Sequence, residues 1–123
     1  MFKNTKKQGD WGLGEAIAYF TKNEYTVSVP LTDSQDYDLI VEKDNKLQRV
    51  QIKTTTYKNK KGSFAVSLTT KGGNRSYSTI KKFNKENVEL VFIVTSENKK
   101  YLIPTDYVLN SIALGPKYDV FLV

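Results

Sequence analysis

A β-hairpin within residues 37–55 is the feature of this sequence that most limits how the chain can fold. Residues 37–42 (YDLIVE) and 46–55 (KLQRVQIKTT) are rich in the β-branched and aromatic side chains that favour strands. Between the two segments stands the pair Asp44-Asn45, which suits a tight turn. We therefore expect two antiparallel strands joined by this turn.

The second strand of this hairpin has two chemically different faces. Side chains alternate along a strand, so Val50 and Ile52 point to one face, while Arg49, Gln51 and Lys53 point to the other. The first face is apolar and is expected to lie on a hydrophobic core. The second is polar, and its residue types are suited to chemistry.

The rest of the chain completes a mixed α/β pattern. Residues 9–23 predict a helix, because apolar side chains recur at helical spacing and Asp10 is a suitable N-cap. Residues 88–95 predict a strand buried on both faces. Residues 76–84 are expected to be a short helix or an irregular segment, and residues 105–113 a last short helix. The order α-β-β-β-(α)-β-β-α indicates a central sheet flanked by helices. No Pro/Gly/Ser-rich linker divides the chain, so we expect one domain over residues 1–123.

Composition excludes several kinds of active site. The chain has no cysteine and no histidine. Disulfide scaffolds, thiolate zinc sites and every mechanism with an imidazole base are therefore excluded. Carboxylates, amides, hydroxyls, lysines and an oxygen-ligated metal remain available. The formal net charge is +6, which favours a polyanionic partner such as nucleic acid.

Nothing in the sequence predicts a membrane or secreted protein. The N-terminal segment MFKNTKKQGDWG lacks the apolar stretch of a secretory signal. The longest apolar run, residues 88–94, is too short to span a bilayer. We therefore expect a cytoplasmic protein.

The predicted hairpin brings three chemically useful side chains together. Pairing around the turn moves Asp38 toward Gln51 and Lys53. Asp38, the Gln51 amide oxygen and the Ile52 carbonyl are ligands that suit a hard divalent cation such as Mg²⁺. Lys53 is suited to position a water, to assist its deprotonation or to stabilise charge on a phosphorane. This grouping indicates a metal-dependent phosphodiesterase, and the alternative is an ordinary solvated strand face.

The same residues carry a resemblance to a known family. Asp38, followed thirteen residues later by Gln51-Ile52-Lys53, resembles the D-(x)n-(D/E/Q)-x-K signature of the PD-(D/E)XK nuclease superfamily. Residues 12–16 (GLGEA) resemble the first helix of that fold, and residues 30–55 are most similar to intron-encoded homing endonucleases. The resemblance implies a restriction-endonuclease-like mixed sheet flanked by helices. It also implies cleavage that needs Mg²⁺, for which Mn²⁺ substitutes.

The sequence departs from the signature at Gln51, and this departure makes Glu15 more important as a second carboxylate. Gln51 stands where the superfamily usually has Asp or Glu, so the site would hold its metal with less negative charge. The resemblance therefore adds Glu15, from the first helix, to the catalytic set of Asp38, Gln51 and Lys53. Helical geometry alone places Glu15 about 150° from the apolar stripe, on a side that is itself partly apolar. The alternative is an ordinary exposed helix glutamate.

Two basic segments follow the motif and are expected to contact DNA. The first is a loop, and the second is a glycine-rich loop in which the backbone can approach a partner closely. Their candidate DNA-binding residues are Lys58, Lys60, Lys61, Lys71, Asn74 and Arg75. Arg75 has the bidentate geometry that reads guanine. The alternative for both segments is a solubilising surface.

Together these observations predict a metal-dependent endonuclease that acts on duplex DNA, with intron homing as the expected role. One small domain covers a single cleavage point, so a homodimer or homotetramer is expected. Restriction or Holliday-junction cleavage is the nearest alternative role. A non-catalytic DNA-binding module on the same fold is an alternative of another class. A protein-interaction domain that uses the apolar C-terminal residues 118–123 is a third.

Overall fold

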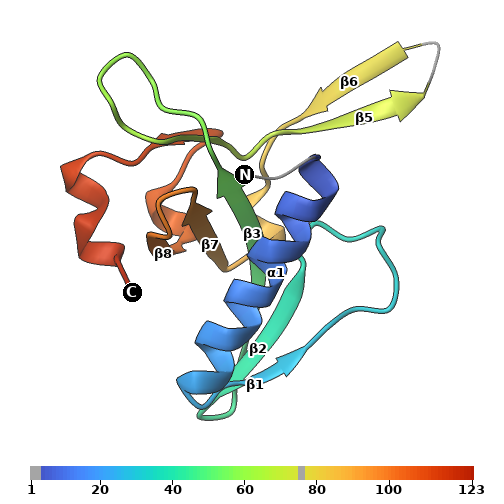
Figure 1. Ribbon diagram of the computed structural model, residues 1–123. Coiled ribbons are helices and arrows are strands. Elements are labelled where there is room, and N and C mark those ends of the chain that lie inside the picture. The colour runs from blue at the N-terminus through green and yellow to red at the C-terminus, as the bar shows by residue number, and fades with distance from the viewer. Residues whose placement is uncertain (1–3, 75–76) are drawn as a thin grey trace.

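A computed structural model describes residues 4–74 and 77–123, and for residues 70–74 and 77–81 it describes the backbone alone. A five-stranded mixed sheet in the order β1-β2-β3-β7-β8 forms its centre (Figure 1). These strands are β1 (Thr26–Ser28), β2 (Leu39–Lys43), β3 (Lys46–Thr55), β7 (Leu90–Thr95) and β8 (Lys100–Pro104). Strands β3 and β7 run parallel, and the other neighbours are antiparallel. The expected mixed α/β fold is confirmed.

The β2–β3 hairpin forms at the predicted place. Asp44 and Asn45 both have positive φ, 53° and 65°, as a tight hairpin turn requires. Leu39 pairs with Val50, so β3 continues beyond the first residue of β2. We call this continuation, residues 51–55 of β3, the motif edge.

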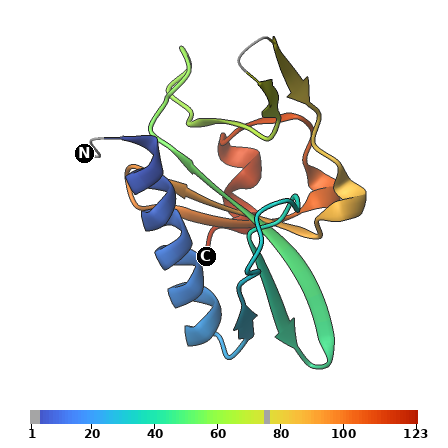
Figure 2. The same cartoon turned by 90° about the vertical axis from the view of Figure 1, so that its right-hand side faces the viewer.

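Helix α1 (Thr5–Lys22) covers one face of the sheet, as Figure 2 shows. It buries Gly12, Ala16 and Phe20 against the sheet, which is the helical spacing expected for a core face. The helix begins earlier than predicted, because Asn4 rather than Asp10 is its N-cap. The Asn4 side chain accepts a hydrogen bond from the Lys7 backbone N–H at 2.8 Å.

The opposite face of the sheet is covered by short strands and 3₁₀ turns. Strands β4 (Ala65–Ser67) and β9 (Ser111–Ala113) pair there, with turns η2 (Thr105–Tyr107) and η3 (Pro116–Phe121). All six residues of β7 are buried between the two covered faces, as predicted for a strand buried on both sides. The expected helix at residues 105–113 is wrong. Ile112 is buried there in strand β9, so pairing with β4 closes the core instead.

A second prediction fails between β4 and β7. Strands β5 (Thr70–Asn74) and β6 (Tyr77–Lys81) form an antiparallel ribbon, followed by the turn η1 (Lys85–Asn87). The short helix or irregular segment expected at residues 76–84 is therefore wrong over residues 77–81, whereas residues 82–84 are irregular. The glycine-rich loop expected at residues 71–75 is wrong over residues 71–74, which belong to β5. Aromatic and β-branched residues in β6 suit a strand, and the pairing with β5 decides the outcome. The ribbon projects away from the central sheet (Figures 1 and 2).

Within the described part of the chain, no helix has both the length and the apolar character needed to cross a membrane.

Candidate active site

Asp38 is fixed to the motif edge by two hydrogen bonds. Its backbone N–H donates to the Val50 carbonyl at 2.8 Å. Its carboxylate oxygen Oδ2 accepts a hydrogen bond from the Ile52 backbone N–H at 2.7 Å. Since Leu39 pairs with Val50, the preceding residue Asp38 lies beside the start of the motif edge. The hairpin thus brings Asp38 to the motif strand, as the sequence predicts.

Gln51 carries the most unusual polar atom in the described structure. The residue is only 8% exposed. Its Oε1 is buried and has no hydrogen-bond partner among the described residues. Leaving a buried acceptor unsatisfied costs about 1–3 kcal/mol. Such an oxygen is suited to accept a hydrogen bond from a bound molecule or to coordinate a cation.

Lys53 completes the polar face, and its charge interacts with that of Asp38. Burial lowers the pKa of Lys53, and the nearby Asp38 charge opposes this shift. Asp38 as a residue is exposed, yet its carboxyl group is crowded by protein. Desolvation therefore raises the pKa of Asp38, against the opposing effects of the Ile52 N–H and the Lys53 charge. Both groups therefore lie in a partly desolvated setting, in which each favours the charged form of the other.

The oxygen atoms at the motif edge fit a hard divalent cation. The N–H and carbonyl of one strand residue face the same neighbour, so the Ile52 carbonyl faces the side on which Asp38 lies. With the Asp38 carboxylate and Gln51 Oε1, this gives three oxygen donors of the kind that Mg²⁺ takes. The described residues contain no cluster of three or more Asp, Glu, His or Cys side chains with metal-binding geometry. The set is therefore poor in charge and contains one carboxylate.

The structure does not bring Glu15 to these residues. Its carboxylate Oε2 lies 3.3 Å from the Lys100 Nζ of β8. Glu15 also lines a cavity of about 530 Å³ with Tyr19 and Lys22, whereas the cavity at Asp38 is lined by Leu13 on the other flank of the helix. Helix α1 packs on the face of the sheet opposite to Gln51 and Lys53, and its buried residues Gly12, Ala16 and Phe20 set a rotation that turns Glu15 toward Lys100.

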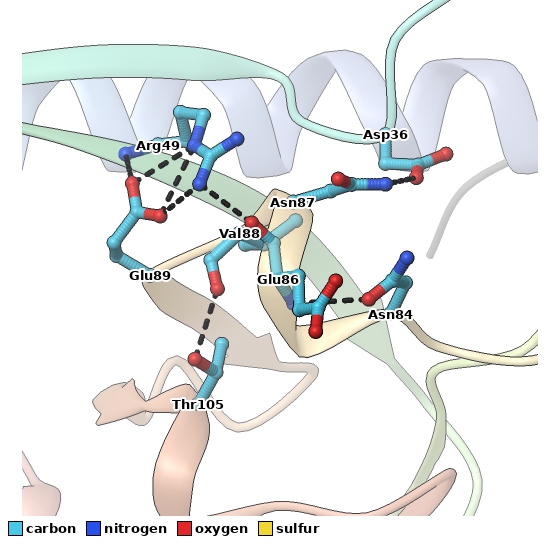
Figure 3. Close-up of polar contacts among 8 residues, drawn as sticks. All are labelled: Asp36, Arg49, Asn84, Glu86, Asn87, Val88, Glu89 and Thr105. Carbon is cyan, nitrogen blue, oxygen red and sulfur yellow. Dashed lines mark hydrogen bonds and ion pairs between the residues drawn. The ribbon is translucent and has the colours of Figure 1, made fainter.

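Sequence reasoning missed a polar cluster next to the site, which joins β3 to the segment before β7 (Figure 3). The Glu89 carboxylate accepts hydrogen bonds from the Arg49 backbone N–H at 2.7 Å and from the Arg49 guanidinium. This pairing raises the pKa of Arg49 and lowers the pKa of Glu89. Arg49 lies two residues before Gln51, so the contact ties the start of the motif to the segment before β7.

The same cluster reaches the chain on the other side of Asp38. The Asn87 side-chain amide donates a hydrogen bond to Asp36 Oδ2 at 2.8 Å. Figure 3 shows Asn87 turned toward Asp36 and Arg49 turned toward Glu89. Arg49 was visible in the sequence as a member of the polar face. Its partner is forty residues away, and no local pattern points to it.

The predicted DNA-binding residues have different surroundings. Lys58 Nζ pairs with Glu97 Oε2 at 2.8 Å, which offsets its charge. Lys60 and Lys61 are exposed in the turn that follows. The backbone of Lys71 and Asn74 lies in β5, and Arg75 lies outside the described residues.

Comparisons with known proteins identify the family and the fold. Residues 3–114 match the family model of the PD-(D/E)XK endonuclease. The solved structure of a bacterial homing endonuclease, I-Ssp6803I, is similar in fold, with a TM-score of 0.83 and 23% sequence identity over 97% of this chain and 88% of that one. No curated protein matches the sequence. The family match covers nearly the whole chain, including the helix, the hairpin and the motif strand, and this chain therefore belongs to the PD-(D/E)XK endonuclease family.

Proposed function

We propose that this protein is a metal-dependent DNA endonuclease that hydrolyses phosphodiester bonds of duplex DNA in intron homing. The family match supports nuclease chemistry, and the likeness in fold to a homing endonuclease supports the biological setting. The observation that carries the proposal is the buried Gln51 Oε1, which has no hydrogen-bond partner in the described part of the chain and lies on the strand face that also holds Lys53.

The proposed metal is Mg²⁺, for which Mn²⁺ would substitute. Asp38, Gln51 Oε1 and the Ile52 carbonyl would hold it, because all three are hard oxygen donors at one strand edge. When bound, such a cation polarises a phosphate oxygen and lowers the pKa of an attacking water.

The protein's own residues supply orientation and charge. The Ile52 N–H holds the Asp38 carboxylate against β3, so its second oxygen keeps a defined direction. The Lys53 ammonium donates a hydrogen bond to a non-bridging oxygen of the phosphate and stabilises the negative charge that develops there. As a water oxygen bonds to phosphorus, the bond from phosphorus to the leaving oxygen breaks in line with it.

Charge and exposed surface support the proposed partners. The net charge of +6 favours a phosphate backbone, and the proposed contacts come from the Lys60–Lys61 turn and from the β5–β6 ribbon. We extend the proposal to a homodimer or homotetramer. Large apolar side chains are exposed near the end of the chain, among them Leu109 at 73% and Val120 at 80%.

The test is cleavage of supercoiled and linear duplex DNA with Mg²⁺, Mn²⁺ or EDTA. Wild-type protein is compared with Lys53→Ala and with Lys46→Ala, an exposed lysine at the turn end of the same strand. We expect cutting that needs the metal, survives Lys46→Ala and disappears in Lys53→Ala.

Two outcomes would contradict the proposal. Cutting that is unaffected by Lys53→Ala would place the chemistry elsewhere. Salt-sensitive binding without cutting of any DNA, including a library of random duplex sequences, would favour a non-catalytic DNA-binding module.

A further inference from the structure

A cavity lies beside Asp38 on the face of the sheet that α1 covers. Its volume is about 300 Å³, and it is lined by Gly9, Leu13, Asp38, Ile52 and Thr54. Gln51 and Lys53 point to the opposite face of β3, so this cavity is separate from the proposed catalytic side chains. Asp38, at the end of its strand, borders both.

Gly9 leaves open space on this cavity. Gly9 and Leu13 are four residues apart in α1, so they lie on the same side of the helix. A Cβ added at Gly9 would meet no atom within 4 Å. Glycine weakens a helix relative to alanine, so this position carries a penalty that no contact within the described residues explains.

The other two glycines of α1 provide a comparison. A Cβ at Gly12 would lie 2.5 Å from Thr54 Cγ2, so Gly12 is required for the helix to pack on β3. A Cβ at Gly14 would also meet nothing within 4 Å, but Gly14 is exposed and does not line the cavity. Open space alone therefore does not distinguish Gly9, whereas its place beside Asp38 does.

Hydrogen-bond donors stand at the same cavity. Gln8 Nε2 donates to Thr54 Oγ1 at 2.9 Å. The Thr54 hydroxyl is the acceptor in this bond, so its own hydrogen can be donated to a further acceptor. The Gln8 amide likewise has a second N–H. Phosphate and sugar oxygens of a nucleic acid backbone are acceptors of the matching kind.

We propose that Gly9 is a DNA-contact position, where the backbone next to the scissile phosphate lies against α1 and accepts hydrogen bonds from Gln8 and Thr54. This inference rests on the proposed endonuclease function, because the cation held at Asp38 offsets the repulsion between that carboxylate and a phosphate. A side chain at Gly9 would take the space that the DNA backbone occupies.

The test compares Gly9→Ala and Gly9→Leu with the matched variants Gly14→Ala and Gly14→Leu. Both alanine variants should raise the melting temperature, by about 3–5 °C, because alanine favours the helix. The Gly14 variants should bind and cut duplex DNA like the wild type. Gly9→Ala should lower kcat/KM by about tenfold, or the affinity for a labelled duplex by the same factor, and Gly9→Leu should lower it further.

A second measurement observes the contact without a substitution. Amide NMR signals of ¹⁵N-labelled protein are followed while a short duplex is added in the presence of Mg²⁺. The Gly9 signal should shift and the Gly14 signal should stay.

The outcomes separate this inference from the proposed function. If the wild type cuts or binds DNA while the Gly9 and Gly14 variants behave alike and the Gly9 signal stays, the contact at Gly9 is wrong and the endonuclease proposal stands. If the wild type neither cuts nor binds and no amide signal moves, the proposed function fails and this inference fails with it.

Discussion

At the scale of single residues, Gln51 connects stability with function. A buried amide oxygen without a hydrogen bond opposes folding, while the same oxygen is available to a cation. Asp38 and Lys53 add to the free-energy cost of folding, because burial disfavours the charged forms of both side chains. The site is therefore expected to be less stable than an apolar strand face of the same shape, and a bound cation should offset part of that cost.

Replacing Gln51 should test this directly. Gln51→Met keeps the side-chain length and removes the unsatisfied oxygen, so we expect the metal-free protein to gain about 1 kcal/mol of stability. The rise in melting temperature that Mg²⁺ or Mn²⁺ produces in the wild type should be absent. Thermal unfolding with EDTA and with each metal measures both effects. A variant less stable than the wild type that still responds to metal would contradict the assignment.

The pH dependence of cleavage follows from the two shifted groups. Asp38 must be ionised to hold a cation, and burial raises its pKa above the ordinary 3.8, so activity should fall on the acid side at a pH above that value. Lys53 acts as a cation, and burial lowers its pKa below 10.5, so activity should also fall on the alkaline side below that value. A pH profile of single-turnover cleavage measures both limbs. A rate that rises steadily to pH 10 would instead make Lys53 a base.

At the scale of elements, the hairpin, the helix and the segment before β7 converge on the motif edge. Helix α1 approaches β3 closely at Gly12, where a side chain would collide with Thr54. The turn η1 lies between the β5–β6 ribbon and β7, and from it Asn87 reaches the segment that carries Asp38. The ribbon is thus connected to Asp38 through the turn η1 and the hydrogen bond from Asn87 to Asp36, which lies two residues before Asp38.

Asn87 should therefore act as a positioning residue. In Asn87→Ala the hydrogen bond to Asp36 is lost, so kcat should fall several-fold while KM changes little. Asn84→Ala is the matched control. It removes a bond of similar length in the same turn, which the Glu86 backbone N–H donates to Asn84 Oδ1. Equal kinetics in the two variants would mean that the Asn87 contact serves stability alone.

At the scale of the whole molecule, the arrangement separates a compact core from a projecting basic ribbon. The central sheet is covered on both faces, whereas β5 and β6 form a sheet of their own that leaves the body (Figure 1). A two-stranded ribbon has the width to enter the major groove of DNA. The ribbon is therefore a candidate DNA contact that lies outside the hydrogen bonding of the central sheet.

Removing charge from the ribbon should change the salt dependence of DNA binding. Lys71 and Lys81 lie in the two strands of the ribbon. If each neutralises one phosphate, the double variant Lys71→Ala/Lys81→Ala should reduce the slope of log K against log salt by about 1.8. Its melting temperature should match that of the wild type. Fluorescence anisotropy across a salt series measures the slope, with Lys46→Ala as the control, which should leave the slope unchanged.

Much of the site was predictable from local patterns. Alternation along residues 46–55 places Gln51 and Lys53 on one face of the strand. The Asp44-Asn45 turn sets the register of the hairpin, which brings Asp38 beside that strand. These relations depend on neighbours a few residues apart along one hairpin, where backbone geometry alone determines which side chains meet. The continuous apolar run of β7 likewise predicts a strand that is buried on both faces.

Tertiary structure alone decided the remainder. The rotation of α1 turns Glu15 toward Lys100 and Gly9 toward Asp38, and that rotation follows from packing on a sheet whose strands are far away in sequence. The ribbon replaced an expected short helix or irregular segment because β5 and β6 pair with each other, and Glu89 pairs with Arg49 across forty residues. Local propensities differ by fractions of a kcal/mol per residue, whereas these long-range contacts together contribute several kcal/mol. The long-range contacts therefore determined the structure wherever the local sequence pattern was weak.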